Sequence, residues 1–125
     1  AIVPEIHPEF AILGKSWPQE VFVHYIFEVT LSPGYSAEAY AEAWIRASEI
    51  IQRAPGAQGT RLHRKIGDPT RLLAIATWES KSARDAMESR LPQQVMDIIA
   101  EQTPHVEITL LGEFEAPEWE VVPEA

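Results

Sequence analysis

The chain contains no cysteine, so disulfide bonds, thiolate nucleophiles and thiolate metal sites are all excluded. Cations are scarce as well: 10 Lys and Arg stand against 19 Asp and Glu, for a formal net charge of -9. Nucleic acids and anionic membrane surfaces repel such an acidic protein, so we expect neither as a partner. No apolar run approaches the roughly 18 residues of a membrane span.

The beginning of the sequence lacks a basic start followed by an apolar run, so we expect no signal peptide, although Ala1 as first residue leaves a processed precursor open. The cysteine-free composition favours a cytoplasmic location. The 125 residues, 46% of them hydrophobic, are enough for a single core. The sequence therefore predicts one domain over residues 1–125, with an N-terminal arm (1–20), a core (21–115) and a C-terminal arm (116–125) that dock on the domain or on a partner.

Charge is unevenly distributed along the chain. Residues 104–125 carry six Glu and no Lys or Arg, whereas residues 57–71 carry four cations against Asp68 alone. The acidic end and the basic segment either complement each other, within one chain or across a dimer, or form two solvated surfaces.

Alternation with a period of two predicts a strand over residues 21–31. One of its faces is wholly apolar: Val21, Val23, Tyr25, Phe27, Val29 and Leu31. The other is mixed: Phe22, His24, Ile26, Glu28 and Thr30. Helices usually cover the apolar face of such a strand, while water, a second sheet or a ligand cavity covers the mixed one.

Turn and capping residues divide the rest of the chain. A helix is predicted over 37–53, with Ser36 as N-cap and Pro55-Gly56 as its end. Strands over 58–66 and 72–79 flank the turn Gly67-Asp68-Pro69-Thr70.

A helix follows over 81–90, a shorter one after Pro92, and a last strand over 105–115. In that strand, Phe114 alternates in step with Val106, Ile108 and Leu110, and Glu113 falls on the other face. The order is an α+β, ferredoxin-like βαββαβ fold with a four-stranded antiparallel sheet and two main helices on one face.

Four segments, in order and spacing, resemble the antibiotic biosynthesis monooxygenase family of dimeric α+β barrels. They are Ser32-Pro33-Gly34, Arg53-Ala54-Pro55-Gly56, Gly67-Asp68-Pro69 and Thr77-Trp78-Glu79-Ser80. The resemblance implies a homodimer whose sheets face each other and a small-molecule ligand. Some members oxidise polycyclic aromatic substrates with oxygen and without metal or flavin, so no cofactor is expected.

The sequence departs from two patterns of this family. It contains no asparagine, and residues 81–103 contain no histidine. Haem-degrading members resemble one another in an Asn, Trp and His set, so that activity is not expected here. The quinone-forming members also use an Asn near a Trp. Trp78 is the residue that the resemblance transfers, either as part of a substrate site or as a core aromatic.

Polar residues on the predicted strands form the candidate site. His24 and Glu28 share the mixed face, about 13 Å apart. If Leu62 and Ile66 face the helices, Arg61 and His63 face the barrel. The proposed catalytic residues are His24 or His63 as base and Arg61 on the developing anion; the substrate-binding residues are Trp78, Glu28, Ile26 and Arg64.

Structural alternatives stay open for these residues: a surface or interface histidine, and an arginine paired with Glu28 or Glu79 at a sheet edge. The four histidines have no ligand spacing, so no metal site is expected. Two functions remain: a cofactor-independent monooxygenase, or a related enzyme, acting on an aromatic or polyketide-like substrate, and a non-catalytic dimeric barrel that binds a small molecule.

Overall fold

The computed structural model of the chain describes residues 22–124, so the predicted N-terminal arm lies outside the described residues. Its elements are β1 (Val23–Leu31), α2 (Ala37–Ile51), β2 (Ala57–Arg64), β3 (Arg71–Trp78), α3 (Lys81–Ser89), α4 (Gln93–Gln102), a 3₁₀ turn η1 (Thr103–His105) and β4 (Val106–Glu115). This order confirms the predicted ferredoxin-like α+β fold.

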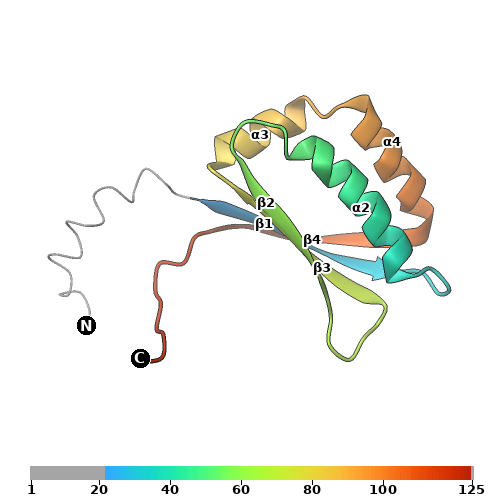
Figure 1. Ribbon diagram of the computed structural model, residues 1–125, viewed down its shortest axis with the longest axis horizontal. Coiled ribbons are helices and arrows are strands. Elements are labelled where there is room, and N and C mark those ends of the chain that lie inside the picture. The colour runs from blue at the N-terminus through green and yellow to red at the C-terminus, as the bar shows by residue number, and fades with distance from the viewer. Residues whose placement is uncertain (1–21, 125) are drawn as a thin grey trace, which may run out of the picture.

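The four strands form one antiparallel sheet in the order β2-β3-β1-β4. Helices α2, α3 and α4 lie together on one side of it (Figure 1). None of the helices in residues 22–124 has the length and apolarity needed to cross a membrane. The sheet therefore has a helix-covered face and a face that no described element covers, which we call the open face.

The predicted apolar face of β1 is the face that the helices cover. Val23, Val29 and Leu31 are buried, and Val29 packs in one cluster with Leu72 of β3 and Tyr40 of α2. Burial raises the pKa of Tyr40 to about 12, because the ionised phenolate would lose its hydration there. Ala74 of β3 is only 1% exposed, so the space above this small side chain is filled.

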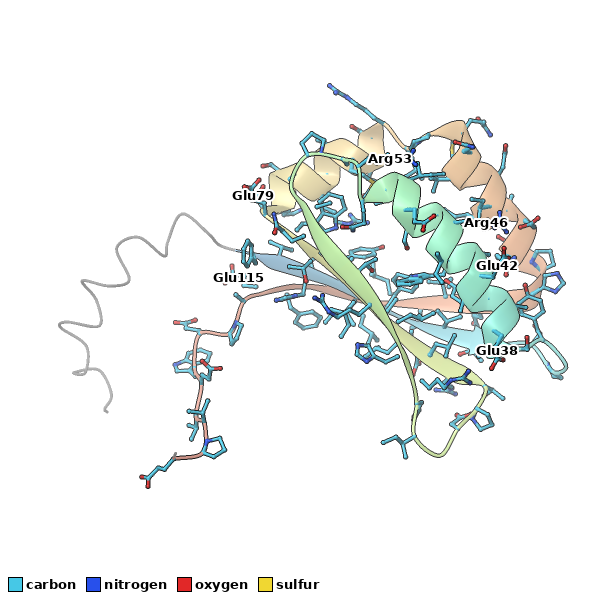
Figure 2. The ribbon with its side chains drawn as sticks, viewed as in Figure 1. Glu38, Glu42, Arg46, Arg53, Glu79 and Glu115 are labelled. Atoms are coloured by element: carbon cyan, nitrogen blue, oxygen red, sulfur yellow. The ribbon has the colours of Figure 1, made fainter. Side chains whose placement is uncertain are left out.

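Local sequence explains where the helices begin. The Ser36 hydroxyl accepts the N–H of Ala39 at 3.0 Å at the start of α2, and the Ser80 hydroxyl accepts the N–H of Ala83 at 3.1 Å at the start of α3. Figure 2 shows Glu42 and Arg46 along α2, and Arg46 Nε lies 3.3 Å from Glu42 Oε2. Helix α2 ends at Ile51, earlier than the predicted residue 53.

The predicted alternation of β4 is wrong beyond Leu110, because a β-bulge interrupts the strand there. Ile26 pairs with Gly112 and Phe27 pairs with Leu110, so Leu111 is an extra residue in the ladder. Gly112 has φ 131°, a conformation that L side chains rarely adopt. The extra residue exchanges the two faces, so Phe114 lies with His24 on the open face and Glu113 lies with Tyr25 on the helix-covered face.

Beyond β4 the chain leaves the domain. The N–H of Ala116 donates to the carbonyl of Phe22 at 3.1 Å, and the segment that follows runs away from the sheet (Figure 1). In this segment Trp119, Val121 and Val122 are exposed.

Trp78 is a core residue by burial, with 1% of its surface exposed. We expect Trp78→Ala to lower the free energy of unfolding by about 3–5 kcal/mol, because truncation leaves a large cavity. Ile66→Ala, at a position that is 98% exposed, should change it by less than about 0.5 kcal/mol. Urea denaturation of the two variants checks this, and equal losses would contradict the assignment.

Candidate functional site

Cross-strand register arranges the open face in rows. His24 pairs with Thr77 and Phe114; Ile26 with Ile75 and Gly112; Glu28 with Leu73 and Thr109. On β2, Arg61 lies beside Ile75 and His63 beside Leu73. The face therefore has an apolar centre of Ile26, Leu73 and Ile75, with polar side chains at its ends and along the β2 edge.

His24 is held by a neighbouring hydroxyl. Its Nδ1 lies 3.1 Å from Oγ1 of the buried Thr77. When Nδ1 carries the proton and donates to Thr77, Nε2 is left as an acceptor that can take a proton from a ligand. In this tautomer the geometry suits a base.

Glu28 is paired within its own sheet. Its Oε1 accepts from Arg71 Nη1 at 3.4 Å, and Arg71 Nε lies 3.6 Å from Asp68 Oδ2. The predicted pairing of Glu28 with an arginine is thus present, but the arginine is Arg71 rather than Arg61. This pair closes one end of the apolar centre, and the His24–Thr77 pair closes the other.

Arg61 and His63 line the open face from the edge strand. The register puts His24 and Arg61 two strands and two residues apart, on the order of 12 Å between Cα atoms. His63 lies two residues further along β2. The structure therefore brings His24, Ile26, Glu28, Arg61 and His63 onto one surface without direct contact between His24 and either β2 side chain.

Two predicted site residues lie elsewhere, and the prediction is wrong about their position. Trp78 pairs with Val23 and is buried on the helix-covered face, opposite His24. Arg64 also points to the helix side, where its Nη2 donates to Glu38 Oε2 at 2.7 Å. This hydrogen bond lowers the pKa of the Glu38 carboxyl. One cavity cannot hold both Trp78 and His24, because adjacent paired residues on a strand alternate between faces.

The helix-covered side holds a buried cation that the sequence analysis missed. The Arg84 guanidinium of α3 lies 3.6 Å from the centroid of the Tyr25 ring. Its Nη1 is 2.8 Å from Glu88 Oε1 and 3.6 Å from Glu113 Oε2. The i,i+4 spacing of Arg84 and Glu88 was visible in the sequence, but the contact with Glu113 depends on the bulge in β4.

Between α2 and β2 the surface is hollowed. This open hollow of about 370 Å³ is lined by Trp44, Ile45, Ser48, Glu49, Gln52 and Thr60. Within residues 22–124, no group of three or more His, Asp or Glu side chains is placed to hold a metal ion.

The four-stranded antiparallel sheet with its helices on one face defines a ferredoxin-like α+β protein. Residues 22–94 match the model of the antibiotic biosynthesis monooxygenase family, and the chain belongs to that family. No curated protein matches the chain.

Solved structures show the same fold at low identity. SnoaB, a cofactor-independent oxygenase from Streptomyces nogalater, is 13% identical with a TM-score of 0.64, over 83% of this chain and 99% of that one. A candidate antibiotic biosynthesis monooxygenase from Chloroflexus aurantiacus is 20% identical with a TM-score of 0.60, over 82% of this chain and 97% of that one. A Bacteroides thetaiotaomicron protein of unknown function, a possible oxidoreductase, is 13% identical with a TM-score of 0.64, over 78% of this chain and 99% of that one.

Arg84 and Arg46 are matched helix arginines that each pair with two carboxylates, but their side chains are 11% and 44% exposed. We expect Arg84→Gln to lower the free energy of unfolding by about 1–3 kcal/mol, because it removes a charged hydrogen bond and the stacking on Tyr25. Arg46→Gln should cost no more than about 1 kcal/mol, since water screens an exposed pair. Urea denaturation measures both, and a smaller loss for Arg84→Gln would refute the difference.

Proposed function

We propose that this protein is a cofactor-independent monooxygenase that acts on an aromatic or polyketide-like substrate on the open face of the sheet. The observation that carries the proposal is the family match over residues 22–94, which includes every proposed site residue. The fold shared with SnoaB, a cofactor-independent oxygenase, supports the same reaction class. The rows of the open face supply an apolar platform with a histidine and an arginine at its margins.

The proposed enzyme is a cytoplasmic homodimer whose two open faces meet. The open face carries Ile26, Leu73 and Ile75 at its centre and Phe114, 50% exposed, on β4. A contiguous apolar surface of this kind is unfavourable in water and is typical of an interaction or ligand site. Two sheets packed face to face lie about 10 Å apart, and their inner side chains fill the space between them, so a flat aromatic substrate could replace part of that packing.

The proposed chemistry turns a CH₂ group held between aromatic rings into a carbonyl. His24 takes a proton from this carbon, and Arg61 stabilises the negative charge that conjugation spreads to a ring oxygen. The carbon donates its electrons to O₂ and forms a C–O bond, and the resulting hydroperoxide loses water. The sum is CH₂ + O₂ → C=O + H₂O, so the substrate itself is the reductant.

The other predicted residues take different parts in this proposal. Ile26 and Glu28 border the substrate surface, and His63 is the second candidate for the base. Trp78 supports β3 from the opposite face and does not touch the substrate. Arg64, paired with Glu38, positions β2 against α2.

The second candidate function is a non-catalytic dimeric barrel that binds a small molecule. The observation that favours it is the His24–Thr77 contact in its other direction: when the Thr77 hydroxyl donates to Nδ1, the proton of the neutral ring sits on Nε2, which then cannot accept one. Glu28 is likewise already paired, with Arg71. A binding surface needs no free base, whereas the enzyme needs Nε2 of His24 to be available.

Dimerisation through the open face is tested by a charge at its centre. We expect Ile26→Glu to shift sedimentation at micromolar concentration from dimer to monomer. Ile26 pairs with Ile75 and Gly112, so joining the faces would bury two carboxylates with no cation directly opposite them. Ile66→Glu places the same charge at the exposed hairpin tip and should leave the dimer intact. A wild-type chain that sediments only as a monomer would count against the dimer.

Turnover is tested under oxygen with a panel of polycyclic phenols that carry a CH₂ group between aromatic rings. Oxygen uptake and the absorbance of the quinone product measure the rate. We expect His24→Ala to lower the rate by at least about 100-fold, the usual contribution of a general base, with an unchanged melting temperature. Thr77→Val should lower the rate less, because the imidazole remains but loses the hydroxyl that orients it.

Normal turnover by the His24→Ala protein would end its assignment as the base. Loss of turnover in His63→Ala alone would move that role to His63. Tight ligand binding by the wild-type chain without oxygen uptake on any ligand bound would favour the non-catalytic barrel.

A further inference from the structure

The C-terminal arm, residues 116–124, has apolar side chains without a partner among the described residues. Trp119 is 84% exposed, Val121 97% and Val122 66%. Figure 1 shows this arm running away from the sheet. Large exposed apolar side chains gathered on a short segment outside any helix or strand are typical of a surface that another element covers.

The sequence of the arm alternates in a way that suits a strand. Glu118 and Glu120 fall on one side of an extended backbone, and Trp119 and Val121 fall on the other. An added strand would therefore present two carboxylates to one face of a sheet and two apolar side chains to the opposite face.

Strand β2 offers a matching edge. It pairs with β3 alone, so the backbone groups on its other side have no strand partner in the described chain. On the open-face side this edge carries Arg61, with Lys65 just beyond the strand. On the helix side it borders the hollow that includes Trp44 and Thr60.

Polarity on the two sides of β2 matches polarity on the two sides of the arm. With Glu118 and Glu120 toward Arg61 and Lys65, Trp119 points toward the hollow between α2 and β2. That hollow also offers two polar side chains, Ser48 and Glu49, that can accept the indole N–H.

We propose that the C-terminal arm of one copy adds as a strand to the β2 edge of a second copy, with Trp119 in the hollow. The arm begins at β4, and β2 is at the opposite edge of the same sheet. To add at the outer edge of its own β2 the arm would have to turn back and cross four strand spacings, about 19 Å. The arm is a contact additional to the proposed pairing of open faces, and it rests on the homodimer of that proposal.

The absence of cysteine makes cross-linking specific. One chain carries Val122→Cys in the arm, a second carries Gln58→Cys in β2, and the two are mixed and treated with a short bismaleimide. We expect a cross-linked heterodimer from this mixture. A mixture in which the second chain carries Asp97→Cys, on the exposed surface of α4, should give at least about 10-fold less product.

A single chain with both Val122→Cys and Gln58→Cys distinguishes the two possible hosts. Cross-linking between chains supports the proposal. A product within one chain that does not depend on concentration would show that the arm folds back on its own β2 and would overturn it, as would no product at all.

Charge exchange tests the pairing independently. The pair Glu118→Lys and Glu120→Lys, or the pair Arg61→Glu and Lys65→Glu, should each weaken cross-linking by about 10-fold, and a mixture of the two charge-exchanged chains should restore it. Trp119→Ala should weaken it by at least about 10-fold, as removal of an interface anchor does. Unchanged cross-linking in these variants would reject the arm contact. If the arm contact is lost and the protein still sediments as a dimer, the proposed pairing of open faces is unaffected.

Discussion

A single layer of helices can bury only one face of a sheet, and the side chains of this sheet divide accordingly. The odd-numbered residues of β1 and the even-numbered residues of β3 meet α2 and α3, and there the core forms around Val29, Leu72 and Trp78. Their sequence neighbours, among them His24, Ile26 and Thr77, necessarily occupy the other face. The stability of the chain and its candidate chemistry thus come from the same two strands.

The bulge in β4 adds an electrostatic consequence. Without the extra residue at Leu111, the alternation of β4 would place Glu113 on the open face and Phe114 among the helices. With it, Glu113 lies near both Lys81 and Arg84 of α3, at 3.5 and 3.6 Å, and Phe114 joins the row of His24. One glycine-dependent irregularity therefore ties α3 to the edge strand and makes the open face more apolar.

The order of the elements could be predicted because it depends on local signals: proline-glycine turns, serine caps and hydrophobic periods. The two faces of β1 were predicted correctly for the same reason. The prediction that put Trp78 in one site with His24 was wrong because it depends on register between strands, and Trp78 pairs with Val23 rather than with a residue of the open face. The bulge was missed because Gly-Glu-Phe-Glu fits an uninterrupted strand equally well. Arg84 was missed because its burial results from packing on Tyr25, which no spacing within α3 reveals.

Membership of the family does not determine which residues of this chain would carry out a reaction. The sequence contains no asparagine. Any activity must therefore use a different set of groups from the Asn and Trp of the quinone-forming family members. On the open face the Cα atoms of His24 and Arg61 lie on the order of 12 Å apart, a separation suited to a substrate with several fused rings rather than to a small one. A face so wide and uncovered could exclude water from a reaction only if something else closed over it. In the proposed enzyme the chemistry therefore depends on the proposed dimer, because a monomer would leave His24 and Arg61 in bulk water, where an oxyanion gains little from either.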